Sequence, residues 1–277
     1  MNAWHALIGQ LPFEWAQYAF MHNALLAMIL VSPLFALLGC MVINNQMAFF
    51  SEAIGHAALT GIAVGVVAGI ANPLWSMIPV AVLLAFAITL LRHHSAASAD
   101  TIIGLVMAFA VALGVVLLSR GGGFAKYSSY LIGDILTITP GEIAGAAILL
   151  AVIAGIWLIF FNRIALTFLN RPLARSRGIN VWLVESLFAA AVALVVTVSI
   201  PWIGLLVINS LLILPAAAAR NMARNTAQYH AIAVVVSLLS GILGLIGSYY
   251  WNTASGATVV LVAMGFFVLS LAGRIVR

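Results

Sequence analysis

Long runs of apolar residues dominate this sequence and leave few folds open to it. Residues 18–43 and 101–119 contain no Asp, Glu, Lys or Arg, and several further runs are of similar length. A helix needs about 20 apolar residues to cross the hydrocarbon core of a bilayer, whereas the strands of membrane barrels show about 10 residues of alternating polarity. The runs therefore predict an all-α, polytopic helical membrane protein.

The low content of charged residues supports the same fold class. Only 6% of the 277 residues are charged and 65% are hydrophobic, against about 25% charged residues in soluble domains. No stretch is left for a sizeable soluble domain, so we expect a single transmembrane domain over residues 1–277. The formal net charge of +5 would suggest a nucleic-acid partner for a soluble protein. Here we assign it to basic cytoplasmic loops and expect no nucleic acid.

The apolar runs divide the chain into eight or nine membrane spans. Residues 1–17 precede them and are interpreted as an N-terminal interfacial segment, because Trp side chains prefer the headgroup level. We expect breaks or kinks at Pro201 and Pro215. The nine expected spans are residues 18–43, 48–70, 74–91, 101–119, 143–161, 181–199, 203–219, 229–250 and 257–272. In the alternative with eight spans, one of these runs is re-entrant.

The positive charges predict the orientation of nine spans. With the C-terminus in the cytoplasm, nine arginines fall on the cytoplasmic side and only Arg120 and Lys126 fall outside. Cytoplasmic loops carry the excess of Lys and Arg in such proteins, so we expect the N-terminus outside. The cytoplasmic arginines are Arg92, Arg163, Arg171, Arg175, Arg177, Arg220, Arg224, Arg274 and Arg277.

One polar pair interrupts the second apolar run. Glu52 and His56 are four residues apart, so they lie one turn apart on the same face of a helix. Ionisable groups inside the membrane are costly, and they usually face a bundle interior or a water-filled path. A carboxylate and an imidazole are also ligands for Zn, Mn or Fe. We interpret the pair as part of a transport path that supplies two ligands; the alternative is that both side chains only bond to neighbouring helices.

A stripe of small residues follows the polar pair. Gly61, Gly65 and Gly69 recur at every fourth position, a pattern that lets another helix approach closely. We expect these glycines to hold the helix that carries Glu52 and His56 tightly against a partner helix, which would fix the geometry of the pair.

The remaining polar residues of the spans carry weaker signals. We interpret Glu185 as a snorkelling or capping acid near the start of a helix, and Asn209 as an interhelical hydrogen-bonding group. A solvated basic loop is the default interpretation of the adjacent His93 and His94. The other histidines, interpreted as incidental, are His5, His22 and His230.

The loop at residues 162–180 is the best candidate for a surface that binds a partner. It contains the sequence Leu173-Ala174-Arg175-Ser176-Arg177-Gly178. A short helix there, ended by Gly178, could dock into a groove of a cytoplasmic protein; the alternative is that the charges only set the orientation. The sequence contains no G-x-x-x-x-G-K-[ST] phosphate loop. Any ATP hydrolysis would therefore belong to another chain, and we expect no enzyme activity in this one.

Four motifs follow one another over nearly the whole chain, within a stretch from about Phe20 to Ala272. They are MAFFSEAIGHAAL at residues 47–59, DTIIG at 100–104, YLIGDIL with the following TP at 130–140, and NSLLILPAAAAR at 209–220. In this order they resemble the motifs of the membrane permeases of the bacterial zinc, manganese and iron ABC importers, most closely the high-affinity zinc uptake permeases. Each motif alone is modest, and their common order makes the resemblance strong.

The resemblance implies a type II ABC-importer-like permease of the bacterial inner membrane. It implies a homodimer with cytoplasmic ATPase subunits and an extracytoplasmic metal-binding protein as partners, and a coupling role for residues 162–180. Glu52 and His56 would occupy the metal-site positions, and the transported divalent ion would be zinc, or else manganese or iron, with no permanently bound cofactor. The sequence departs from the family pattern twice: Glu52 stands where Asp is usual, and Gly55 where Ser or Ala is common.

Other functions stay open on the residues alone. A permease for a metal chelate such as an iron chelate or cobalamin would need a wide cavity rather than a narrow site with ionisable ligands. A proton-coupled secondary carrier would use Glu52 and His56 as a proton relay and would need no ATPase. In a purely structural membrane subunit the pair would only pack.

Overall fold

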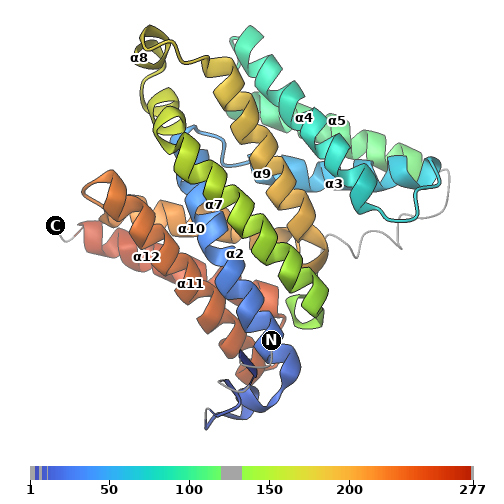
Figure 1. The fold of residues 1–277 in the computed structure, drawn as a ribbon, viewed down its shortest axis with the longest axis vertical. Helices are drawn as coiled ribbons and strands as arrows, with labels where there is room; N and C mark the ends of the chain where they lie inside the picture. Colours follow the sequence, from blue (N-terminus) through green and yellow to red (C-terminus); the bar gives the residue numbers. More distant parts are fainter. Residues whose placement is uncertain (1–3, 6–7, 11, 120–132, 276–277) are drawn as a thin grey trace. The chain divides into compact units, whose positions relative to one another are not determined.

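The computed structural model describes residues 4–5, 8–10, 12–119 and 133–275, which are largely helical and contain no strand. Within these ranges nine helices are long and apolar enough to cross a membrane, which confirms the all-α polytopic class and matches the larger expected number of spans. Figure 1 shows their course. They are α2 (Ala19–Asn44), α3 (Phe50–Val67), α4 (Leu74–His94), α5 (Ala99–Ser119), α7 (Pro140–Leu169), α9 (Val181–Ile203), α10 (Leu205–Met222), α11 (Thr226–Trp251) and α12 (Ser255–Ile275).

The chain divides into two compact units. In the first, α10, α11 and α12 pack against one another; in the second, α3 packs against α4 and α5. Three helices, α2, α7 and α9, contribute one part to each unit. The first unit consists of Met1–Cys40, Gly133–Ala154 and Trp202–Arg277, and the second of Met41–Ile132 and Gly155–Pro201. The short elements are η1 (Glu14–Gln17), η2 (Ile135–Thr137) and α8 (Arg171–Ser176).

Within the second unit, α3 is held at close range by both of its neighbours. A Cβ atom at Gly61 would lie 2.6 Å from the Met77 Cα of α4, closer than a side chain can approach a backbone. Toward α5, the Thr60 hydroxyl donates a hydrogen bond to the Ala110 backbone oxygen. A Cβ at Gly114 would lie 2.9 Å from the Thr60 Oγ1. Small residues therefore allow backbone-to-backbone packing around the helix that carries Glu52 and His56.

The other two glycines of the stripe have different surroundings. A Cβ at Gly65 would collide with the Ser76 side chain next to α3, whereas nothing lies within 4 Å of a Cβ at Gly69. α3 ends at Val67, and Gly69 adopts a φ of 71° in the turn that follows. The prediction of a helix-packing role for Gly69 is therefore wrong, because its lack of a side chain serves the left-handed turn conformation.

The two prolines at which we expect breaks or kinks lie inside continuous helices, so neither one breaks the chain, and a kink at Pro201 stays a prediction. Pro201 belongs to α9 and Pro215 to α10, which membrane helices tolerate when neighbouring groups satisfy the freed carbonyls. The chain instead breaks at Gly204, which separates α9 from α10 and has a φ of 83°. A Cβ at Gly133 would overlap the Gly204 backbone, so this contact excludes a side chain at Gly133.

Some expected features differ in extent or lie outside the described residues. Arg120 and Lys126 of the predicted outer loop, and residues 130–132 of the third motif, lie outside them. The predicted loop at 162–180 is shorter than expected, because α7 continues to Leu169 and only Asn170 separates it from α8.

Candidate functional site

Glu52 and His56 are the only accessible side chains on the first fourteen residues of α3. Every other residue from Phe50 to Ala63 is buried, whereas the Glu52 and His56 side chains are 40% and 34% exposed. Ionisable groups in a membrane helix usually face a bundle interior or a water-filled path, so this exposed carboxylate and imidazole indicate an opening or a partner at this face of α3.

The two side chains lie close together and are available to a ligand. The His56 Nε2 and Glu52 Oε1 atoms are 4.0 Å apart, too far for a hydrogen bond. Metal bonds of about 2.0–2.2 Å to each atom could bridge this distance with a small rotation of either side chain. Among the described residues, no group of three or more His, Cys, Asp and Glu side chains could hold a metal ion. Among the described residues this pair could therefore supply two ligands at most, and a complete site would need others.

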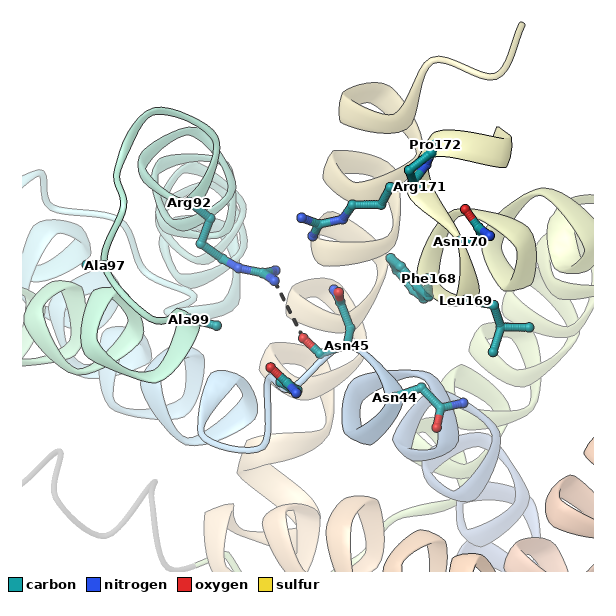
Figure 2. Close-up of a pocket in the computed structure, with 11 residues that line it drawn as sticks. Asn44, Asn45, Arg92, Ala97, Ala99, Phe168, Leu169, Asn170, Arg171 and Pro172 are labelled. Carbon is teal, nitrogen blue, oxygen red and sulfur yellow. Dashed lines mark hydrogen bonds between the residues drawn. The ribbon is translucent and has the colours of Figure 1, made fainter. Parts of the chain in front are cut away.

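The connection that leads into α3 is fixed by an arginine of α4. The Arg92 Nη1 donates to the Met47 Sδ at 2.9 Å, and its Nη2 lies 3.5 Å from the Asn45 backbone oxygen (Figure 2). The Asn45 side-chain amide also donates to the Met47 Sδ at 2.9 Å. These contacts hold the segment immediately before Glu52. Sequence reasoning assigned Arg92 to topology alone and missed this positioning role.

A polar pocket of about 560 Å³ opens beside this connection. Figure 2 shows Arg92 and Arg171 extending toward it from α4 and α8. The Arg171 Nη2 forms an ion pair with the Glu185 Oε1 at 2.8 Å. Glu185 is 7% exposed, so the expectation of a snorkelling or capping acid is wrong: a buried carboxylate needs a cation, and Arg171 supplies it. The pocket is lined by Asn44, Asn45, Gln46, Arg92, Ala97, Ala99, Phe168, Leu169, Asn170, Arg171 and Pro172.

The short helix α8 has a buried side and an exposed side. The Asn170 side chain caps its start by accepting a hydrogen bond from the Leu173 N–H at 3.0 Å. Ala174 is fully buried, whereas Leu173, Arg175 and Arg177 are exposed. The expected Gly178 stop follows the helix with a φ of 72°. Ala174 thus anchors α8, and the two arginines and the leucine are presented outward.

The weaker sequence signals have mixed outcomes. The Asn209 Oδ1 is buried without a hydrogen-bond partner among the described residues, so the expected interhelical bond from this atom is not found there. His93 and His94 are both exposed, as expected for solvated residues, but they belong to the last turn of α4 and not to a loop. His5 and His22, which the sequence alone marks as incidental, contact each other.

Comparison with known proteins gives a consistent result over most of the chain. Residues 17–274 match the family described as the ABC 3 transport family. The chain is 33% identical over 252 residues to the high-affinity zinc uptake system membrane protein ZnuB of Haemophilus influenzae, covering 91% of this chain and 96% of the relative. It is 28% identical over 260 residues to the manganese transport system membrane protein MntC of Halalkalibacterium halodurans, covering 91% and 87%.

Solved structures agree with these relatives. The chain matches PsaBC from Streptococcus pneumoniae in complex with Fab with a TM-score of 0.80 and 27% identity, covering 98% of this chain and 95% of the other. An inward-facing structure of a putative metal-chelate type ABC transporter matches with a TM-score of 0.65 and 17% identity, a similarity that speaks for the fold alone.

Proposed function

The chain belongs to the ABC 3 transport family of metal-importer permeases, and we propose that it carries a divalent transition-metal ion into the cytoplasm along a path that includes Glu52 and His56. As a multi-pass protein of the bacterial inner membrane with permeases as relatives, it is a transporter subunit and not an enzyme. The observation that carries the proposal is the accessible carboxylate–imidazole pair on an otherwise buried helix.

The chemistry of the pair suits a transported ion. A carboxylate and an imidazole together bind zinc, manganese and iron, and relatives of this chain are described as zinc, manganese and iron transport proteins. We favour zinc because the zinc relative is the more similar of these. Few protein ligands and some water let the ion leave again, as a permease site requires. Ligand binding needs an ionised carboxylate and a neutral imidazole, so acid should weaken it.

The partners of the chain also belong to the proposal. A second copy of the chain would add a second Glu52–His56 pair, and a homodimer would thereby supply the ligands that one chain lacks. Cytoplasmic ATPase subunits would supply the energy, since the sequence has no phosphate loop, and an extracytoplasmic metal-binding protein would deliver the ion. The exposed side of α8 would contact the ATPase.

The test is metal uptake by variants of the pair. His56→Ala and Glu52→Gln should each lower the rate of Zn²⁺ uptake at least about tenfold, since each removes a ligand. Both variants should stay in the membrane and co-purify with the ATPase subunit. Glu52→Asp keeps a carboxylate and should retain uptake, with a changed preference between Zn²⁺ and Mn²⁺. His93→Ala, at an exposed histidine, is the matched control. Parental uptake in both His56→Ala and Glu52→Gln would show that the pair is structural.

A further inference from the structure

Two histidines contact each other near the start of α2, within the first unit. The His5 Nδ1 and His22 Nδ1 atoms are 3.1 Å apart, and the ring centroids are 5.0 Å apart. His22 is buried, with 5% of its surface exposed. The Trp4 indole N–H donates a hydrogen bond to the His22 backbone oxygen at 2.9 Å, and this bond ties the segment that carries His5 to α2.

The Ala16 carbonyl determines which ring nitrogen of His22 carries the proton. The His22 Nε2 lies 2.7 Å from the Ala16 oxygen, and a carbonyl can only accept, so Nε2 holds the hydrogen. In the neutral ring, the His22 Nδ1 then has a free lone pair, which faces His5. Metal-binding histidines are commonly fixed in this way, with the second ring N–H donated to a backbone carbonyl.

The second imidazole has the right position for a shared ion. With this tautomer of His22, whose Nδ1 has no hydrogen, the His5 Nδ1–H must donate the hydrogen bond between the two rings. If the His5 proton moves to its Nε2, which gives the other neutral tautomer, the two Nδ1 lone pairs converge. Metal–nitrogen bonds of about 2.0–2.1 Å in a tetrahedral site place two ligand atoms about 3.3 Å apart. The observed separation of 3.1 Å is close to this value.

The pair lies at the end of α2 that is opposite the basic loops. α2 has 26 residues and is therefore about 39 Å long. Its last residue, Asn44, lines the pocket with Arg92 and Arg171, and arginine-rich loops mark the cytoplasmic side. His22, in the first turn of α2, accordingly lies near the extracytoplasmic end, where an imported ion arrives.

We propose that His5 and His22 form a second metal-ion site, which receives a borderline divalent ion such as Zn²⁺ or Co²⁺ on the extracytoplasmic side. Imidazole nitrogens favour these ions over Mn²⁺, which prefers oxygen ligands. Two protein ligands, with water in the remaining positions, hold the ion loosely enough to pass it on. The receiving role rests on the proposed transport function, whereas the binding itself does not.

Binding is tested on the full chain in lipid nanodiscs with Glu52→Gln and His56→Ala, so that the Glu52–His56 pair does not contribute. We expect this chain to bind Zn²⁺ and Co²⁺ in equilibrium dialysis, with Mn²⁺ bound at least about tenfold more weakly. Adding His5→Asn retains a hydrogen-bond donor beside His22 but removes the imidazole, and should weaken Zn²⁺ binding by about tenfold or more. The matched control is His94→Ala, at an exposed histidine, which should bind as its parent does.

Equal Zn²⁺ affinity with and without His5→Asn would overturn the site, and so would an equal loss in the His94→Ala control. The receiving role has its own test in the otherwise unchanged chain. There His5→Asn should raise the KM for Zn²⁺ uptake severalfold and leave kcat unchanged. An unchanged KM in His5→Asn would overturn the receiving role. It would not affect the proposed function, which the Zn²⁺ uptake of that variant would still support. Glu52→Gln should lower Zn²⁺ uptake without changing the Zn²⁺ binding that depends on His5, so the two proposals can fail independently.

Discussion

At the residue scale, the ion pair between Arg171 and Glu185 joins a half-exposed guanidinium to a buried carboxylate. The two charged groups are 2.8 Å apart, and the Glu185 side chain is 8% exposed. Arg171→Met leaves this carboxylate buried without its cation, which should lower the free energy of unfolding by about 1–3 kcal/mol. We expect a lower unfolding temperature of the purified chain in detergent, measured by tryptophan fluorescence.

Two further variants separate the charge from the packing. Glu185→Gln in the Arg171→Met background removes the buried charge and should restore most of the lost stability. Arg175→Met, at an exposed arginine of the same helix, should change the free energy of unfolding by less than about 0.5 kcal/mol. A double variant as unstable as Arg171→Met alone would show that packing, and not charge, makes the contact important.

Local spacing explains why one polar pair could be predicted and others could not. Glu52 and His56 belong to one helix, so their separation of four residues suffices to place them on one face. The Arg171–Glu185 pair joins two helices, and its distance depends on how they pack. His5 and His22 meet only because the chain before α2 folds back onto it, and no periodicity in the sequence reports that contact.

At the scale of elements, the close contact of α3 with α4 should tolerate no added side chain. Gly61→Ala would place a methyl group 2.6 Å from the Met77 Cα, and the resulting overpacking should cost about 1–3 kcal/mol of unfolding free energy. Gly104→Ala, in α5, adds the same group where nothing lies within 4 Å. This control should be neutral or stabilise by up to about 1 kcal/mol, because alanine favours helix.

Thermal unfolding of both glycine variants in one detergent makes the comparison. Gly61→Ala should also slow Zn²⁺ uptake, since a displaced α3 carries Glu52 and His56 with it. Equal unfolding temperatures for Gly61→Ala and Gly104→Ala would mean that α4 can shift to accommodate a methyl group and that its contact does not fix the position of α3.

The apolar pattern predicts the helices of this fold better than it predicts their ends. Hydropathy identifies only the apolar part of a helix. The expected span ends at residue 161, whereas α7 continues to Leu169. The spacing of Gly69 matches a helix-packing stripe. Residues four apart share one face only within a helix, however, and α3 ends at Val67, before Gly69. Similarly, Pro215 predicts a break in the helix, whereas α10 continues through it. In a membrane helix, groups of neighbouring helices can bond to the carbonyl that a proline leaves free.

At the scale of the whole molecule, the net charge of +5 comes from a small number of basic residues, and two of the arginines border one pocket. The pocket at the end of α4 brings together the ends of α2, α4 and α7 with the starts of α5 and α8. The same arginine that borders this pocket, Arg92, holds the connection before Glu52. A movement of α8 would therefore act close to the base of the helix that carries the proposed metal ligands.

Coupling to the ATPase would depend on the exposed side of α8. Ala174 is buried while Leu173, Arg175 and Arg177 are exposed, so charge can be reversed there without disturbing the anchor. Arg175→Glu combined with Arg177→Glu should lower metal-stimulated ATP hydrolysis by the reconstituted complex about tenfold, which corresponds to a loss of about 1.4 kcal/mol. Arg224→Glu, at an exposed arginine of another predicted cytoplasmic loop, should leave hydrolysis unchanged. If the double variant co-purifies with the ATPase and hydrolyses ATP at the parental rate, α8 is not the docking element.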